Sequence, residues 1–433
     1  NKELKLLNSQ IEQSRAILKS KNAAWYPNIT LNSNKFPAYT TGTDSNNLNS
    51  DTSSKQLSIG INTNFEWGII KPERRLEIKI AAEELENSQL SYESRIKELY
   101  LEVLRIYHRI QASNEEIKVA KKSIDISQLS LEEAKNKLIA GIGNKLEVLE
   151  AQTQLERAQI NLVQKQGDLK KNENSLANLL NLPAEINIKK EDVKNIRYLW
   201  PHSKDDSLVA AFKNRLDLKI KEKNISLNEK KGLSVLSKKK PNLNLFNQLS
   251  LSSSRGETNV NNPNFDNTKE SLLNTTGINF SWNLFDGGLI KQNYLSIKEK
   301  DKELMEEFLL NKSTIKNNLF DSLINLDIAK DNIIFSFNQL NSAEETLKIS
   351  LKRMEAGLTT QREIVNIQGD VSEAEKNFIN SITEYNISLA ELERISFLKK
   401  IDICQTSQKE ISNQNEDFYF FIVKNNFNSS CED

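Results

Sequence analysis

Side chains that could carry out catalysis are scarce in this chain of 433 residues. It has two histidines, His108 and His202, and two cysteines, Cys404 and Cys431. A histidine-rich metal site or a serine–histidine–aspartate catalyst therefore has few residues to draw on. Serine, aspartate and lysine residues are spread along helical segments, and no motif places a base beside a nucleophile. We therefore expect no enzyme, no cofactor and no metal site.

The composition narrows the class of protein further. Lysine plus arginine and aspartate plus glutamate both number 59, so the chain lacks the basic excess expected of a nucleic-acid partner. Hydrophobic residues make up 37%, below the usual ~45–50%, which suits long thin helices that each bury one stripe. No run approaches the ~20 apolar residues of a transmembrane helix. In an oxidising compartment the two cysteines could pair, or they could remain free thiols.

The chain carries one pattern twice, at offsets of 214 to 216 residues. LIAGIGNKLEVLEAQ around Gly141 matches MEAGLTTQREIVNIQ around Gly357, and FEWGII at 65–70 matches FSWNLF at 280–285. Two copies are too few for a solenoid, so they indicate a duplication within one architecture. We expect a first repeat over 1–181, an equatorial linker over 182–206, a second repeat over 207–398 and a tail over 399–433.

Comparison of the two repeats suggests how the first repeat should begin. The second repeat has a helical lead-in, SLVAAFKN at 207–214, that the first repeat lacks. We therefore expect the N-terminus to be truncated, with any signal peptide missing from this chain.

Apolar residues recur every seven positions from Ile96 to Leu138 and again from Leu319 to Met354. Small residues mostly stand three positions later, and this combination predicts closely packed left-handed coiled coils. This seven-residue ladder alone fits a simple rod. The expected helix lengths do not fit a rod, because each long helix, ~100 Å in extent, faces two shorter helices stacked end to end. The long helices are expected at 73–139 and 287–356, and the shorter ones at 1–25 with 144–181 and at 205–238 with 360–398.

Period-two alternation from Leu57 to Trp67 and from Ile278 to Leu284 predicts β-strands. Shorter partner strands should follow Pro27 and Pro241, with loops over 34–55 and 253–271. The apolar face, with Phe65, Trp67, Phe280 and Trp282, is typical of membrane-facing strands. Four strands cannot close a membrane barrel and open edges are not tolerated in lipid, so several chains must contribute. The alternative is a soluble four-stranded sheet that caps a bundle.

Together these features resemble the TolC family of outer-membrane efflux channels over residues 1–398. The resemblance rests on the duplicated helix–hairpin–helix–helix plan and on three sequence marks in each copy. These marks are the starts at Pro27 and Pro241, the strand ends WGIIKP at 67–72 and WNLFDGG at 282–288, and the turns at 140–149 and 356–365.

The family resemblance implies a mainly α fold with a β-barrel segment. A homotrimer would form a 12-stranded barrel in outer-membrane lipid, continued by an α-barrel tunnel in the periplasm. It would export small molecules or proteins, as in efflux or type I secretion, together with a periplasmic membrane-fusion adaptor and an inner-membrane transporter.

The resemblance also assigns roles to the glycine turns, which would form the periplasmic entrance. Adaptor docking falls on Gly141, Ile142, Gly143, Gly357, Leu358 and Thr359. Glu147 and Glu363 open the returning helices, where a carboxylate favours the helix dipole. In a trimer, rings of Glu147, Glu150, Glu363 and Asn366 would form a cation-selecting constriction.

Three positions depart from the family pattern. Asn366 stands where a second acid is common, and Met354 and Thr359 stand where a tyrosine and an arginine can brace a closed tip. Closure would therefore rest on apolar packing of Leu138, Ile142, Met354 and Leu358. Two other functions remain open: a soluble coiled-coil scaffold, and a long-helix pore-forming toxin, although a toxin would more often have one continuous apolar segment.

Overall fold

A computed structural model describes residues 1–46, 50–183, 196–259, 267–403 and 416–425 of the chain. The chain divides into two compact units. The helical-hairpin unit comprises residues 1–7, 90–219 and 308–433, and the sheet unit comprises residues 8–89 and 220–307.

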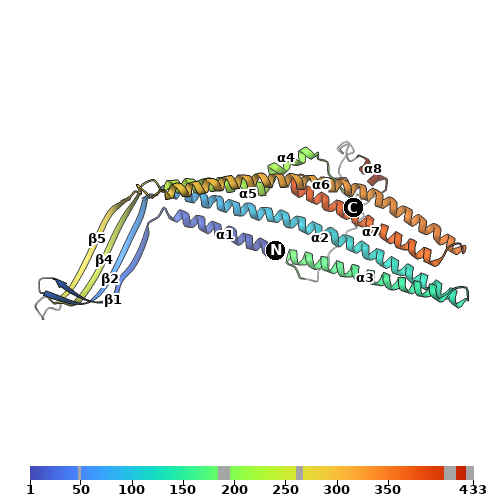
Figure 1. Cartoon of the computed structure of the whole chain (residues 1–433), viewed down its shortest axis with the longest axis horizontal. Helices are drawn as coiled ribbons and strands as arrows, with labels where there is room; N and C mark the ends of the chain where they lie inside the picture. The colour runs from blue at the N-terminus through green and yellow to red at the C-terminus, as the bar shows by residue number, and fades with distance from the viewer. Residues whose placement is uncertain (47–49, 184–195, 260–266, 404–415, 426–433) are drawn as a thin grey trace. The chain divides into compact units, whose positions relative to one another are not determined.

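The described helices repeat the same plan twice (Figure 1). Each repeat has a long helix of 66 or 67 residues, a return helix of 36 residues and a helix of 22 residues. The described helices are α1 (Lys2–Ala23), α2 (Arg74–Ile139), α3 (Lys145–Leu180), α4 (Lys204–Asn214), α5 (Leu216–Ser237), α6 (Leu289–Glu355), α7 (Gln361–Ser396) and α8 (Glu416–Lys424).

One expected helix is wrong. The segment 205–238 was expected to form a single helix, but it is broken at Arg215. Arg215 has extended backbone angles, φ −66° and ψ 126°, so α4 ends there and α5 begins. The Arg215 guanidinium pairs with Asp217 at 2.8 Å, and the Asp217 carboxylate accepts the Leu218 N–H at 3.0 Å. These contacts satisfy a backbone donor of α5 that a continuous helix would have used internally.

The sheet unit contains a four-stranded antiparallel sheet in the order β1-β2-β4-β5. Its strands are β1 (Asn28–Asn46), β2 (Ser50–Ile70), β4 (Asn242–Asn259) and β5 (Asn267–Ser281). One hairpin per repeat is therefore confirmed. The loops expected over 34–55 and 253–271 are wrong, because most of their described residues continue the strands. Serine, threonine and asparagine occupy both faces there, which removes the alternation that marks a strand.

The regular part of the sheet has one apolar face and one polar face. Ile61, Leu251 and Leu272 lie in one row across three strands, and Trp67 lies in a row with Leu245 and Ile278. Because side chains alternate along a strand, the intervening residues face the other way. Those rows are mostly polar: one contains Thr30, Asn64, Gln248 and Thr275, and the next contains Asn32, Asn62 and Ser250 with Leu273 at its end. Glu66 and Phe246 lie opposite each other on the same face.

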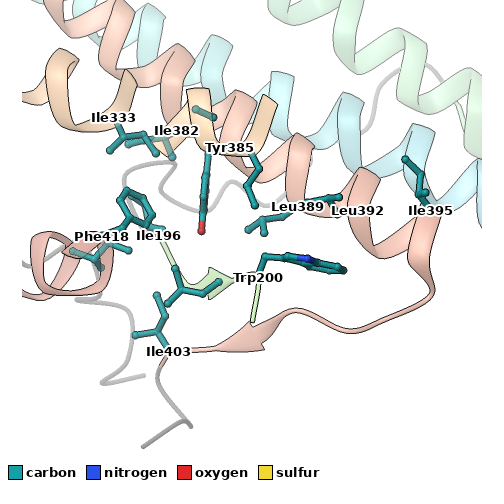
Figure 2. Close-up of a cluster of buried hydrophobic side chains, with 14 of the residues drawn as sticks. Ile196, Trp200, Ile333, Ile382, Tyr385, Leu389, Leu392, Ile395, Ile403 and Phe418 are labelled. Atoms are coloured by element: carbon teal, nitrogen blue, oxygen red, sulfur yellow. The ribbon is translucent and has the colours of Figure 1, made fainter. Parts of the chain in front are cut away.

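The largest core lies in the helical-hairpin unit and includes the C-terminal tail (Figure 2). Phe418 and Ile422 of α8 are buried beside α7 residues, and the rings of Phe418 and Tyr385 lie 5.4 Å apart. Two short strands, β3 (Tyr198–Leu199) and β6 (Ile401–Asp402), pair antiparallel. Strand β3 comes from the expected linker and β6 from the tail, so both segments contribute to the core. The cysteines of the tail lie outside the described residues.

The seven-residue ladder of the second repeat is buried in this core. Leu319, Leu326 and Ile333 are almost fully excluded from solvent. The small residues between them are buried as well, and the Ser336 hydroxyl lies 3.0 Å from that of Ser381 on α7. Small side chains in these positions allow the backbones of α6 and α7 to approach closely, as the heptad pattern predicts.

Candidate functional site: the two helical tips and the sheet junction

The turns at Gly141 and Gly357 have the same geometry. Both glycines are left-handed, with φ of 74° and 72°, a region that disfavours residues with a Cβ atom. The Gly357 N–H donates to the Met354 carbonyl at 2.9 Å, and the Leu358 N–H donates to the Arg353 carbonyl at 2.8 Å. Gly141 and Ile142 repeat this pair of hydrogen bonds at 3.1 Å each. Each long helix therefore ends in a Schellman motif that satisfies its last carbonyls.

The first tip is tighter than the second because of Gly143. The Gly143 N–H also donates to the Lys137 carbonyl, at 3.0 Å. A Cβ atom at this position would lie 2.9 Å from the Lys137 Cβ and 3.0 Å from the Leu138 nitrogen. The equivalent residue of the second tip is Thr359, so only the first turn requires glycine at this place.

The glutamates that open the return helices take part in capping. The Asn144 side chain accepts the Glu147 N–H at 2.9 Å and donates to the Glu147 carboxylate at 3.2 Å. At the second tip the Thr360 hydroxyl accepts the Glu363 N–H, and the Thr359 hydroxyl donates to the Glu363 carboxylate at 2.9 Å. Both glutamates therefore stabilise helix N-termini, whatever further role they have. Glu150 and Asn366, nearly one turn further, are exposed.

Apolar side chains cover the outside of both turns. Ile142 is 81% exposed and Leu358 is 69% exposed. The first tip adds two residues that the sequence did not single out, Ile139 and Leu146, both strongly exposed. They were missed because they fit the helical pattern on either side of the turn. Their counterparts in the second repeat are Glu355 and Arg362, so the first tip is the more apolar one.

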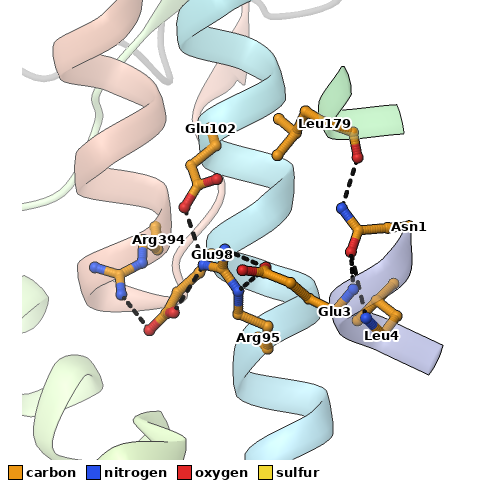
Figure 3. Close-up of polar contacts among 8 residues, drawn as sticks. All are labelled: Asn1, Glu3, Leu4, Arg95, Glu98, Glu102, Leu179 and Arg394. Carbon is orange, nitrogen blue, oxygen red and sulfur yellow. Dashed lines mark hydrogen bonds and ion pairs between the residues drawn. The ribbon is translucent and has the colours of Figure 1, made fainter. Parts of the chain in front are cut away.

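A network of ion pairs lies at the other end of the α2–α3 hairpin (Figure 3). Arg95 of α2 pairs with Glu3 of α1 at 2.6 Å and with Glu102 at 2.9 Å, and Glu98 pairs with Arg394 of α7 at 3.1 Å. Burial opposes the charge of Arg95, but the hydrogen bonds to Glu3 and Glu102 outweigh it and raise its pKa. The network ties segments from both repeats together. Sequence patterns cannot reveal the pairs with Glu3 and Arg394, because their members lie far apart in the chain.

The expected membrane-facing residues lie at the junction where the sheet meets the helices. Phe65, Trp67 and Phe280 follow the strand alternation of the apolar face, and Trp282 comes directly after β5 ends. The Trp67 indole N–H donates to the Trp25 carbonyl at 3.0 Å. The Trp282 indole donates in the same way to the Lys239 carbonyl, at 2.9 Å. These two hydrogen bonds occupy equivalent places in the two repeats.

None of the described helices is long and apolar enough to span a membrane. Within the same described ranges, histidine, cysteine, aspartate and glutamate side chains form no group that could hold a metal ion.

Comparisons with known proteins agree with this geometry. The model of the family described as "Outer membrane efflux protein" matches residues 1–182 and 211–396. Among curated proteins no match is found. Among solved structures, the outer-membrane channel OprN is similar with a TM-score of 0.74 and 14% identity, covering 92% of this chain and 87% of that one.

Two further channels show the same level of similarity. The Campylobacter jejuni CmeC outer membrane channel has a TM-score of 0.72 at 15% identity, over 92% of this chain and 83% of that one. The open state of the Neisseria gonorrhoeae MtrE channel has a TM-score of 0.70 at 13% identity, over 92% of this chain and 86% of that one.

Proposed function

Because the chain belongs to the outer membrane efflux protein family, we propose that it forms a trimeric channel-tunnel that exports small molecules or proteins from the periplasm to the exterior. Family membership supports an outer-membrane location, and the channels of similar fold bear the same description. In this proposal the sheet lies in the outer membrane and the helices extend into the periplasm.

The open sheet supports an assembly of several chains. Its edge strands, β1 and β5, are 19 and 15 residues long, and each pairs along only one side in a single chain. Unpaired backbone groups cost several kcal/mol each in hydrocarbon, so a membrane sheet must close on itself. Pairing β1 of one chain with β5 of the next in a ring of three gives a closed 12-stranded barrel, within the known size range.

The exposed apolar tips are the observation that supports docking of a partner protein. Their backbone hydrogen bonds are satisfied internally, so Ile142 and Leu358 are presented on well-defined turns rather than on loose loops. Exposed apolar side chains on a rigid support are suited to protein contacts. We assign the two tips to docking of a periplasmic membrane-fusion adaptor that links the tunnel to an inner-membrane transporter.

The proposed constriction lies just inside these tips. Glu147 and Glu363 begin the return helices, and a ring of three chains would bring six such carboxylates to one level. Rings of carboxylates favour cations over anions. Glu150 and Asn366 stand nearly one turn further along, so the two tips contribute unequal charge to the second level.

Reconstitution of the full chain tests the proposal. Purified protein should migrate as a trimer on an unboiled gel, fractionate with outer membranes and produce stepwise conductance in planar bilayers. A soluble monomer that never partitions into detergent would contradict the channel and favour a coiled-coil scaffold. A protein that converts from a soluble form to a pore only on contact with target membranes would favour a toxin instead.

A further inference from the structure

The junction between sheet and helices carries a concentration of positive charge that the neutral total conceals. Four segments meet there, at 20–27, 66–75, 238–241 and 282–291. Together they contain eight basic and three acidic residues, a net charge of +5. The far parts of the two hairpins, at 34–58 and 250–271, contain four basic and five acidic residues, a net charge of −1.

The strand register shows that these segments belong to one layer of the sheet unit. Strands β1 and β4 begin there, at Asn28 and Asn242, while β2 and β5 end there. Asn28 lies opposite Glu66, Leu243 lies opposite Ile70, and Asn242 lies opposite Ser281. All four strand ends therefore lie within a few residues of the same level.

Most of this positive charge is not neutralised within the chain. Lys238, Lys239 and Lys240 are consecutive and exposed at the end of α5. Lys71, Arg75 and Lys291 are exposed as well. Within the described part of the chain, none of these six residues has a carboxylate partner within 4 Å, although Lys239 interacts electrostatically with Asp286. Arg74, by contrast, is buried against Trp25, with its guanidinium 4.4 Å from the ring centroid.

Exposed aromatic and apolar side chains are interleaved with these cations. Tyr26 is 75% exposed and Phe285 is 88% exposed, and Trp25, Trp282 and Leu284 are also exposed. The Trp282 indole contacts the carbonyl of Lys239 itself, so an aromatic anchor and the lysine run lie at one level. Aromatic rings together with lysine side chains are suited to the boundary between hydrocarbon and headgroups.

We propose that this layer is a binding surface for anionic phospholipid headgroups, and that Lys238, Lys239 and Lys240 provide its main charge. The phosphodiester of the lipid pairs with the lysine ammonium groups while its acyl chains lie along the apolar face of the sheet. The proposal rests on the outer-membrane placement given above, which puts this layer at the periplasmic leaflet. A structural role for the lysines, as cations at the C-terminal end of α5, predicts an effect on stability without lipid preference.

Native mass spectrometry of the full chain in a neutral detergent tests this, with dioleoyl-phosphatidylglycerol titrated against dioleoyl-phosphatidylcholine. The anionic lipid should bind at least tenfold more tightly, and the preference should shrink as salt is raised, because attraction to each lysine is screened over ~10 Å. Excess inorganic phosphate should compete no better than sodium chloride at equal ionic strength, which distinguishes a lipid site from a phosphate site.

The decisive variant is K238Q/K239Q/K240Q. It should lower the preference for the anionic lipid by tenfold or more, whereas K135Q/K145Q/K170Q, with the same charge change on exposed lysines of α2 and α3, should leave it unchanged. If the first variant does not assemble, R75Q/K291Q removes charge from the other segments of the same layer and should reduce the preference severalfold. An unchanged preference in an assembled variant, or none in the natural protein, would overturn the proposal.

Conductance separates this outcome from the channel proposal. A natural protein that prefers the anionic lipid but forms no channel would contradict the proposed transport alone. A conducting trimer without lipid preference would contradict the headgroup surface alone.

Discussion

The Trp67 indole donates a hydrogen bond of 3.0 Å to the main-chain carbonyl of Trp25, across the junction between the end of α1 and the end of β2. The second repeat makes the same contact from Trp282 to Lys239. Each indole thus fixes the direction in which the chain leaves a helix and enters a strand. The contact needs no particular side chain at the acceptor, which explains why the acceptor residue differs between repeats.

The substitutions W67F and W282F test this role. Each keeps an aromatic ring but removes the donor, and should destabilise the assembled protein by about 1 kcal/mol, the usual net value of one hydrogen bond. The measurement is the temperature at which the trimer converts to monomer on a gel. Y26F, an exposed ring in the same layer, is the matched control and should behave like the natural protein. Unchanged melting in both tryptophan variants would show that the hydrogen bonds are not needed.

Adaptor binding at the apolar tips should be lost when a charge is introduced there, but not when the shape of the apolar side chain changes. I142D and L358D place a carboxylate on an exposed turn, so folding should be preserved while adaptor binding falls at least tenfold. The measurement is the affinity of the purified trimer for its adaptor, or export in cells. I142V and L358M keep the apolar character and should bind normally. Equal loss in both sets of variants would indicate that the turns themselves had been damaged.

Removal of the tip carboxylates should change ion selectivity without unfolding the tips. Glutamine can still make the capping hydrogen bonds of Glu147 and Glu363. In E147Q and E363Q the ratio of potassium to chloride permeability, obtained from the reversal potential in a salt gradient, should therefore fall. E344Q removes an exposed carboxylate from α6 and should leave the ratio as it was. A ratio unaffected by E363Q would remove the constriction from the second tip.

His108 should make the protein less stable in mild acid. Burial, reinforced by the nearby charge of Lys400, lowers its pKa despite a hydrogen bond to Gln111. The unfolded chain therefore binds the proton more readily, and stability is lost as pH falls below about 6.5 towards the folded pKa, by at most about 1.4 kcal/mol per pH unit. Urea unfolding at about pH 7.5 and about pH 5.5 measures the effect.

A neutral replacement isolates the contribution of His108. In H108N the difference in stability between the two pH values should be smaller than in the natural protein. The same difference in both proteins would assign the acid sensitivity to other groups.

The linker should depend on one buried hydroxyl. Tyr385 of α7 is fully buried and donates to the Tyr198 carbonyl at 2.8 Å, and burial raises its pKa, so it remains a donor. Y385F should cost about 1–2 kcal/mol in the free energy of unfolding, because the carbonyl loses its partner. Y419F, at a half-buried tyrosine of α8, is the control and should cost less. Equal unfolding of the two variants in urea would contradict the role of this bond.

The repeated helices could be predicted because their signals are local. The glycine at each turn and the heptad ladder place the ends of α2, α3, α6 and α7 within one or two residues. The break at Arg215 could not be predicted, because the apolar pattern of the sequence continues through it. The break depends instead on the ion pair between Arg215 and Asp217, which competes with continuation of the helix. The far parts of the four strands, expected as loops, were missed for a different reason. Between Thr40 and Ser54 almost every residue is polar, so strand pairing leaves no periodic trace.

The site was predictable in part. The positions of Gly141, Gly357, Glu147 and Glu363 follow from the duplication, but the apolar surface of the first tip also includes Ile139 and Leu146. Their exposure depends on the direction in which the turn sends the two helices, which is set by the tertiary structure and not by a local sequence pattern. The tail was unpredictable for a related reason. Phe418 and Ile422 fill a space created by α7 and β3, residues far away in the sequence.

The polar face of the sheet bears on which solutes could pass through the proposed barrel. Its paired rows of asparagine, serine, threonine and glutamine form a surface of hydroxyl and amide dipoles, some linked directly, as where Ser250 donates to Asn62 at 2.5 Å. Such groups can present either end of their dipole, so they solvate a cation and an anion equally well. In the proposed barrel these rows would act as a neutral polar surface rather than a filter, and sorting by charge would be left to Glu66 on the same face and to the carboxylates of the helical tips.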